Sequence, residues 1–501
     1  MESVVKELVK FYTFFFGKSN KSLLRPGEVG NKSSALFSEY LGHHEGKRDT
    51  SGKAFMMLRK GLIEKLSQYV SVSDPSQIYK SPYQVEHMRA QKDSMNARIL
   101  FSLGLYKSAL YFAKRAVESA QKLEIWDVLV VQSSILSNYF SIRTDKAKFE
   151  YYNDLASFGL DAYQMDFKLR SLQNKWNLRF SKKRKATAKE LEELKQDVIT
   201  ADQIVSDCTL VTPNHHCSRL KLTYYDALMD YNKAIQICIQ ARNLLLSKGK
   251  LQDRNKLAIY HGVQMYCYLN LKDFENAKKF ALELDDYFPE GSLNWFIFME
   301  YYYVLSVQTE NYGNAYKLLR RVGKSPAFGQ LKGVRQQVWK LLAGYMEFAI
   351  SSRIWNNHEK AEEDIKEFRV NKFLNEVVNL GADKTGIQVS VLILQVLFLL
   401  HKEDYAQIID RKDALRRYIY RYLYSKENER SRIFMNMLLR VIESDFSYSI
   451  TREKTSRLLK SLKDQQMNYQ ANLGGNEIID YELLWNWVLK TLKDNWSTAA
   501  A

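Results

Sequence analysis

Along most of the chain, hydrophobic residues recur every three or four positions. The stretch 106–123 is typical, with apolar residues at Ala109, Leu110, Phe112, Ala113, Ala116, Val117, Ala120 and Leu123. This spacing places them on one face of an amphipathic helix. Alternating strand-like runs are scarce, and the six prolines stand beside turn-forming residues or between periodic runs, where a missing N–H is tolerated. The pattern predicts an all-α fold.

The predicted helices come in pairs. Residues 257–289 read as a first helix, a short turn at Lys272 and Asp273, and a second helix that ends at Pro289. The same turn followed by an apolar, usually small residue marks six further second helices, at Ala109, Leu155, Ala234, Ala315, Ala361 and Ile408. From Ala234 onward the marks, Ala277 included, are 38 to 47 residues apart. A lone helix pair cannot bury both of its faces, so we expect neighbouring pairs to stack.

The 257–289 unit resembles the tetratricopeptide (TPR) family. The matching residues are Tyr268, Phe274, Ala277, Ala281 and Pro289. His261 and Met265 stand where the family has Trp and a small residue, and the spacing exceeds the family's ~34 residues. The resemblance implies an α-α superhelix, a TPR-like α-solenoid of roughly eight or nine antiparallel pairs between about Phe55 and Asn495. An irregular multi-helix bundle is the alternative.

Two ends differ from the predicted array. Residues 1–54 read as an N-terminal helix followed by a flexible linker rich in Gly, Ser, Asn and Lys. The array itself is assigned to residues 55–480. Residues 481–501 read as a Trp-rich amphipathic helix with a short tail, and we expect this helix to cap the last pair, since solenoids need a terminal element with a polar face.

Neither a membrane span nor a secretory signal is predicted. The longest apolar run, residues 391–400, has ten residues and includes a Gln, whereas a spanning helix needs ~20; it reads as a buried helix. Charged residues, among them Glu2, Lys6 and Glu7, interrupt the apolar N-terminus. Four cysteines cannot form a disulfide framework in so long a chain. We expect a cytoplasmic protein.

The net charge of +17, from 74 Lys and Arg against 57 Asp and Glu, is concentrated in three segments. They are residues 175–189 (+7), 311–340 (+7) and 411–432 (+5). In the third, Arg417, Tyr420, Arg421 and Tyr424 share a helix face by their spacing, and such a surface suits a nucleic-acid backbone with stacked bases. The alternative has Tyr418 and Tyr422 packed inward below solvated arginines. The nucleic-acid candidates are Lys182, Lys183, Arg184, Lys185, Arg320, Arg321, Arg417, Tyr420, Arg421 and Tyr424.

No catalytic signature stands out. HExxH, GxSxG and paired CxxC patterns are absent from the sequence, and we predict a non-enzymatic protein without a cofactor. The zinc-ligand types Cys208, His215, His216 and Cys217 are clustered, but structural zinc sites usually space paired ligands two to four residues apart. No metal site is predicted there.

The leading hypothesis is a scaffold that binds a protein or peptide in the concave groove of the array. The resemblance places six residues in that groove: Arg219, Thr223, Tyr266, Asn270, Tyr301 and Gln308. The Lys and Asn clamp with which some family members hold a C-terminal carboxylate is not reproduced, and this disfavours that ligand class. Nucleic-acid binding by the three basic segments is the first alternative, and a peptide-responsive regulator is the second. The oligomeric state is left open.

Overall fold

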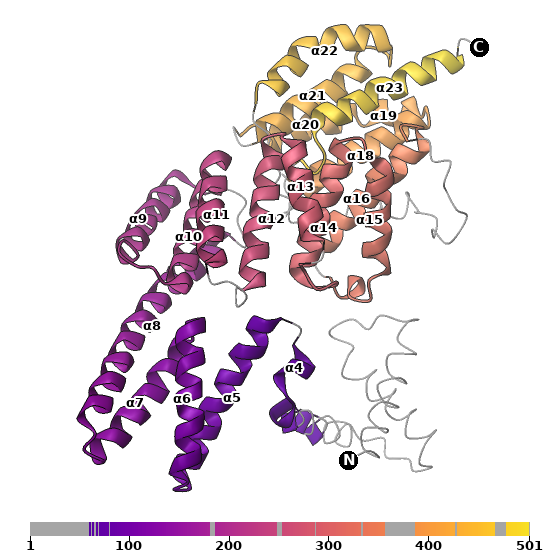
Figure 1. The fold of residues 1–501 in the computed structure, drawn as a ribbon. Coiled ribbons are helices and arrows are strands. Elements are labelled where there is room, and N and C mark those ends of the chain that lie inside the picture. The colour runs from indigo at the N-terminus through magenta and orange to yellow at the C-terminus, as the bar shows by residue number, and fades with distance from the viewer. Residues whose placement is uncertain are drawn as a thin grey trace, which may run out of the picture. The chain divides into compact units, whose positions relative to one another are not determined.

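The computed structural model contains only helical elements in the part of the chain that it describes (Figure 1). The predicted all-α class is therefore confirmed for these residues. They are 60–61, 63–64, 67–68, 70–79, 81–180, 186–247, 253–285, 287–331, 334–355, 386–425, 428–465 and 477–499. The predicted N-terminal helix and linker of residues 1–54, the mark at Ala361, and Lys182 to Lys185 lie outside them.

The chain forms two compact units, residues 1–88 and 89–501. The first unit contains α4 (Pro75–Ile78) and the start of α5 (Pro82–Ser102). The second unit contains the rest of α5 and the helices α6 (Tyr106–Leu123), α7 (Trp126–Ile142), α8 (Lys146–Phe180), α9 (Ala188–Ile204), α10 (Val211–Ala227), α11 (Tyr231–Leu246), α12 (Arg254–Asn270), α13 (Phe274–Leu284), α14 (Leu293–Gln308), α15 (Tyr312–Lys324), α16 (Val334–Ser351), α18 (Ile387–His401), α19 (Tyr405–Asp410), α20 (Lys412–Tyr422), α21 (Glu429–Ile442), α22 (Tyr448–Lys463) and α23 (Tyr481–Ala499). A short 3-10 helix, η3 (Phe328–Gln330), follows α15.

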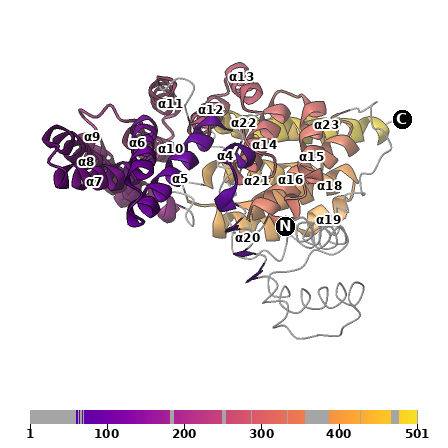
Figure 2. The same cartoon turned by 60° about the horizontal axis from the view of Figure 1, so that its bottom comes forward.

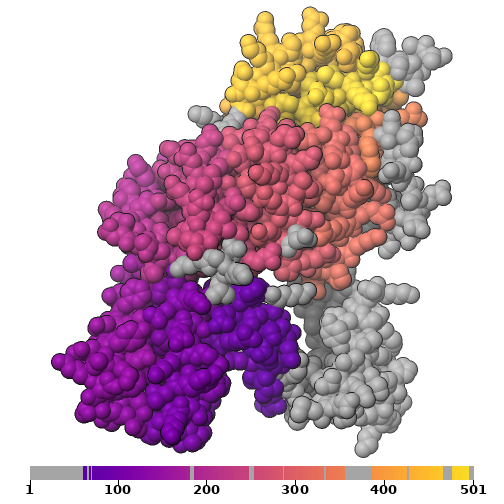
Figure 3. Space-filling model, viewed as in Figure 1, coloured from indigo at the N-terminus to yellow at the C-terminus, as the bar shows by residue number. Residues whose placement is uncertain are grey.

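Helices that follow one another along the chain pack against each other. This holds for α10 with α11, α12 with α13, and α14 with α15, and two longer-range contacts join α8 to α10 and α12 to α14. Both ribbon views show the helices from α10 to α15 side by side (Figures 1 and 2). In the space-filling view, side chains close the gaps between these ribbons (Figure 3). The packing of neighbouring pairs is what the sequence pattern predicted.

One tight turn joins the two helices of a pair at five places in the described part of the chain. A non-glycine residue ends the first helix in the left-handed region, with φ between 54° and 59°. The next residue donates its N–H to the carbonyl five positions earlier, as in a Schellman motif. Its side chain then accepts an N–H from the first turn of the second helix. These capping residues are Asp145, Asp230, Asp273, Asn311 and Asp404.

The turn fixes the register of the second helix. Four positions after the cap, the side chain faces the neighbouring helices and is buried at Ala234, Ala277, Ala315 and Ile408. Leu155 does not occupy this position. The turn before α8 lies at Thr144 and Asp145, so Phe149 is the equivalent residue. The long α8 continues well past Phe149. Leu155 lies further along this same helix, so the predicted mark was placed too late in the chain.

The largest core runs from α12 to α23 and includes the fully buried Trp295, Trp339 and Trp485. Helix α18, which contains residues 391–400, is buried in it: Val391, Leu394 and Leu397 have no exposed surface. The structure thus confirms the buried helix expected for this run. Of the helices described, none is long and apolar enough to cross a membrane.

Helix α23 reaches back to earlier helices instead of covering only the last pair. It packs on α18 as well as on α22. The rings of Tyr312 and Trp487 lie 6.2 Å apart, Lys490 Nζ donates to the carbonyl of Arg353 at 2.8 Å, and Asn495 Nδ2 donates to that of Leu400 at 3.0 Å. The C-terminal helix therefore belongs to the core between α15 and α22.

The recurring cap leads to a stability prediction. Asp273 accepts the Asn276 N–H at 3.2 Å. Replacing Asp273 by Ala should therefore lower the free energy of unfolding by about 1 kcal/mol, since one helix donor loses its acceptor. Asp273→Asn is the matched control and should stay within about 0.5 kcal/mol, because Asn311 makes the same cap one pair later. Urea unfolding measures both, and equal losses would contradict the capping role.

Candidate functional site

A pocket of about 470 Å³ is the strongest candidate for a binding site among the described residues. Its walls come from α10, α12 and α14, the first helices of three successive pairs, with additions from the end of α8 and the start of α11. Apolar side chains form much of the lining, including Phe180, Leu222, Val263, Ile297 and Phe298. The polar groups that reach it are Asn177, Arg219, Thr223, Asp226 and Asn294. A cavity of this size with few polar groups is typical of a ligand site.

Three tyrosines and an aspartate connect the first helices across this pocket. Tyr266 Oη on α12 donates to Asp226 Oδ1 on α10 at 2.8 Å. The ring of Tyr266 also lies 5.8 Å from that of Tyr231 and 5.3 Å from that of Tyr301 on α14. Burial raises the pKa of Tyr266, Tyr301 and Asp226. The phenols therefore stay protonated and able to donate at neutral pH.

Arg219 lies on the same face of α10 as Thr223 and Asp226, one and two turns before them. It is half-buried, and burial lowers the pKa of its guanidinium. Thr223 Oγ1 donates to the Arg219 backbone carbonyl at 3.0 Å. Within the described part of the chain, no carboxylate or other acceptor bonds the guanidinium itself. The pocket therefore contains a positive charge that nothing described there compensates.

Gly262 is a further unusual feature of the pocket wall. A glycine in the middle of a helix costs about 1 kcal/mol relative to alanine, and a close approach of another chain segment usually explains it. Here a Cβ at position 262 would meet nothing within 4 Å. The residue lines the pocket on α12, so its missing side chain leaves space in the pocket and serves no packing contact.

The structure brings together four of the six residues predicted for the groove. Arg219, Thr223, Tyr266 and Tyr301 line this single pocket. Asn270 is buried at the end of α12, where its Nδ2 donates to the Tyr266 carbonyl at 2.9 Å. Gln308 is half-buried at the end of α14, and its Nε2 has no hydrogen-bond partner among the described residues.

Several pocket residues were not predicted from the sequence. Asp226 follows Arg219 by seven positions, so extending the same helix face by two turns would have identified it. Gly262 could have been recognised as a glycine inside a helical pattern. Nothing in the local sequence indicates the contribution of Asn177 and Phe180, because α8 reaches the pocket only through its packing against α10.

Four of the nine described bases of the first two basic segments form ion pairs that bind them to acids of this chain. Lys175 Nζ lies 2.6 Å from Asp197 and Arg179 contacts Glu193 at 2.5 Å. Arg321 contacts Asp285 at 2.6 Å. Arg335 donates to both oxygens of the buried Glu300 at 3.0 Å, where burial raises the carboxyl pKa to about 8. Arg320 is half-buried on α15.

The part of the third basic segment that lies on and directly after α20 differs from the first two segments, because its arginines and two of its tyrosines are exposed. Tyr420 and Tyr424 are 75% and 66% exposed, with their rings 5.5 Å apart, and Arg417 and Arg421 are exposed beside them. The described residues provide no ion pair for either arginine. Tyr418 and Tyr422 are half-buried, and Tyr418 packs on the core. The expected inward tyrosines and the outward face of arginine and tyrosine are therefore both present.

Three of the four residues of zinc-ligand type have separate side-chain partners. His215 Nδ1 lies 2.8 Å from Tyr260 Oη, and His216 Nδ1 lies 2.7 Å from Gln173 Oε1. Burial lowers the pKa of both histidines, that of His216 to about 4. Cys217 Sγ is 3.5 Å from Asp202, and Cys208 is half-buried. These contacts anchor α10 to α8, α9 and α12.

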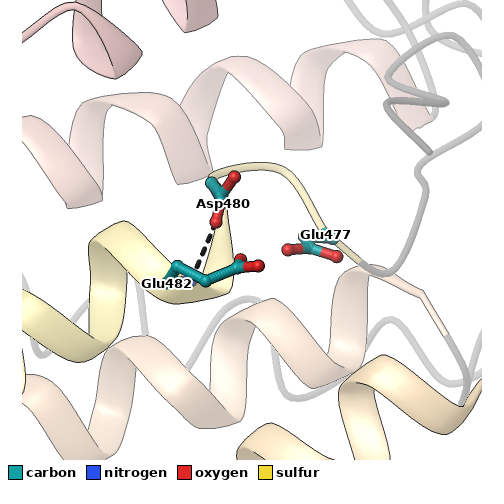
Figure 4. Close-up of side chains that lie close together, drawn as sticks. All are labelled: Glu477, Asp480 and Glu482. Carbon is teal, nitrogen blue, oxygen red and sulfur yellow. Dashed lines mark hydrogen bonds between the residues drawn. The ribbon is translucent and has the colours of Figure 1, made fainter. Parts of the chain in front are cut away.

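The one group of potential metal ligands among the described residues is acidic: Glu477, Asp480 and Glu482 (Figure 4). Arg430 occupies its centre. This guanidinium donates to Glu477 at 2.8 Å through Nε and to Glu482 at 2.6 Å through Nη2, and Lys272 Nζ lies 2.9 Å from Asp480. Two cations already neutralise most of the charge of the three carboxylates. The cluster is an ion-pair network that connects α21, the α12–α13 turn and the start of α23.

The network also affects protonation. Burial raises the pKa of Glu482 to about 7. Burial alone would raise the pKa of Asp480 as well, but its hydrogen bonds with Glu482 and Lys272 hold it below the ordinary value. Glu482 is therefore partly protonated near neutral pH, which offsets part of the excess negative charge.

Comparisons of the chain with protein-family models, with curated proteins and with solved structures give no match. The likeness to the TPR family rests on the individual residues named above.

Removing Arg430 tests the ion-pair network. Arg430→Met leaves Glu477 and Glu482 buried without their main partner, so the free energy of unfolding should fall by about 3–5 kcal/mol. Arg457→Met, at an exposed position on α22, is the matched control and should change it by less than about 0.5 kcal/mol. Urea unfolding at neutral pH measures both. A loss below about 1 kcal/mol for Arg430→Met would show that the network is not structural.

Proposed function

We propose that this chain is a non-enzymatic helical-repeat protein that binds a peptide segment of a partner in the pocket between α10, α12 and α14. The observation that carries the proposal is the position of Gly262. A helix interior normally selects against glycine, no packing contact requires one here, and a side chain would fill the pocket. Keeping this space open has a cost in stability that a binding function explains.

The helix arrangement supports a repeat array as the scaffold. The same left-handed turn with the same Asp or Asn cap joins α10 to α11, α12 to α13, and α14 to α15. Equivalent turns place equivalent helices side by side, so the first helices form one layer. Peptide ligands of such arrays lie on the inner layer of first helices. The pocket residues Arg219, Tyr266 and Tyr301 belong to this layer.

Filling the pocket should abolish peptide binding. Peptides would be selected from a displayed random library on the full-length protein and measured by surface plasmon resonance. Gly262→Phe, whose ring occupies the pocket, should weaken the selected peptides at least ten-fold. Gly323→Phe on α15 is the matched control, because a Cβ there also meets nothing within 4 Å and the position is exposed outside the pocket.

Two results would contradict the proposal. Selected peptides that bind both variants as tightly as the wild type would place the binding site elsewhere. Equal weakening by Gly262→Phe and Gly323→Phe would indicate a general effect on the fold. Circular dichroism melting of both variants checks the fold, and Gly262→Ala should be about 1 kcal/mol more stable than the wild type, as expected for a helix interior.

Nucleic-acid binding is the second candidate function, and the exposed face of α20 favours it. Tyr420 and Tyr424 offer two exposed rings for base stacking, which contributes ~1–3 kcal/mol per base at such sites. Arg417 and Arg421 stand next to them without carboxylate partners in the described part of the chain. The first two basic segments contribute less to this proposal, because Lys175, Arg179, Arg321 and Arg335 already pair with acids.

A charge-matched pair of variants tests this candidate. Arg417→Gln with Arg421→Gln should weaken binding of a fluorescein-labelled single-stranded RNA or DNA oligonucleotide at low salt. The log–log salt slope should become shallower by about 1.4, since each lost phosphate contact contributes ~0.7. Arg452→Gln with Arg457→Gln removes the same charge from exposed positions on α22. Fluorescence anisotropy that shows no binding, or equal loss in both double variants, would rule out the α20 surface.

A further inference from the structure

The charge of Arg219 identifies the ligand chemistry of the pocket. A guanidinium stays protonated under all physiological conditions, and a charge that is even partly buried without a partner has lost some of its hydration with nothing in return. Among the described residues this guanidinium has neither an ion pair nor a hydrogen-bond acceptor, although it lines the pocket. We propose that the pocket binds its ligand through an oxyanion, a carboxylate or a phosphate, that pairs with Arg219. This inference rests on the pocket being the binding site proposed above.

The groups around Arg219 do not supply the missing negative charge. Its nearest titratable neighbours include Tyr260 and Cys238. Burial raises the pKa of the Cys238 thiol to about 12 and also raises the pKa of the Tyr260 phenol above its ordinary value, so both are neutral at pH 7. Asp226 faces the same pocket but lies two helix turns away, about 10 Å along the axis of α10. Its carboxylate accepts from Tyr266 instead.

The two ends of the pocket therefore differ in sign. The Arg219 end presents a fork of N–H donors that matches the two oxygens of a carboxylate or phosphate. The Asp226 end presents a carboxylate that repels a second anion and accepts hydrogen bonds. The rings of Tyr266 and Tyr301 and the apolar side chains of Leu222 and Val263 line the same pocket. A ligand with one oxyanion joined to an apolar or aromatic body fits this distribution.

Three small probes of similar shape test the proposal on the full-length protein. Phenylacetate carries a carboxylate, phenyl phosphate carries a phosphate, and phenylacetamide is neutral. Ligand-observed NMR or calorimetric titration should show at least one of the two anions binding ten-fold or more tightly than phenylacetamide. The stronger of the two anions identifies the preferred oxyanion. This comparison needs no variant, so it does not depend on how a substitution folds.

Substitution then assigns the effect to Arg219. Arg219→Gln should weaken the preferred anion at least ten-fold and leave phenylacetamide unchanged, whereas Arg219→Lys should retain part of the affinity because it keeps the charge without the fork. Arg457→Gln on α22 is the control and should behave as the wild type. The melting temperature of Arg219→Gln should be equal to or above that of the wild type, because no internal partner is lost.

Any of three results would overturn the inference. The first is equal binding of phenylacetate, phenyl phosphate and phenylacetamide. The second is anion binding that Arg219→Gln leaves intact, and the third is the absence of binding by all three probes. The outcome is separable from the proposed function. Arg219-dependent anion binding without any selected peptide would retain the oxyanion site and reject the peptide scaffold. Selected peptides that bind Arg219→Gln as tightly as the wild type would retain the peptide scaffold and reject the oxyanion site.

Discussion

The left-handed turn between paired helices is the constraint on which the rest of the structure depends. A non-glycine residue in this conformation is disfavoured by roughly 1–2 kcal/mol, yet Met229, Lys272 and Glu310 all adopt it. Two backbone hydrogen bonds and a side-chain cap offset the cost at each turn. Because the turn fixes where the second helix starts, it also fixes which residues of the second helix face their neighbours, among them the buried Ala234, Ala277 and Ala315. The same turn follows α10, α12 and α14, the three helices that line the pocket together.

The alignment of these three helices produces the pocket and the interactions that hold it. Tyr266 can reach Asp226 on one side and Tyr301 on the other only because three first helices share one register. The same register brings Arg219 and Gly262 to the cavity wall. Both residues are unfavourable for stability alone, one through a partly buried charge without a partner among the described residues and one through backbone entropy. Their presence in the same cavity is what the proposed binding role would explain.

The sequence was sufficient for elements that depend on local patterns. Helical periodicity identifies the all-α class, and the Lys272–Asp273 turn followed by Ala277 identifies a pair. The groove positions taken from the TPR resemblance bring Arg219, Thr223, Tyr266 and Tyr301 to one pocket. Local patterns could not show that α23 packs on α18, that Arg430 meets Glu477 and Glu482, or that Asn177 joins the pocket. These contacts join residues far apart along the chain, and no spacing rule encodes them. Leu155 was wrongly predicted to follow the turn directly. The apolar face of the long α8 repeats along its whole length, so the spacing of apolar residues did not show where the turn lies.

Arg430 and Arg219 illustrate opposite uses of the same side chain. Arg430 donates to two carboxylates and to the carbonyls of Leu462 and Gln465, so its donors are largely satisfied within the fold. Arg219 stands at a cavity with no such partner in the described part of the chain. A structural arginine gains from complete internal pairing, whereas a recognition arginine must leave its donors for the ligand. By this criterion Arg430 belongs to the architecture, and Arg219 fits the recognition role proposed for the pocket.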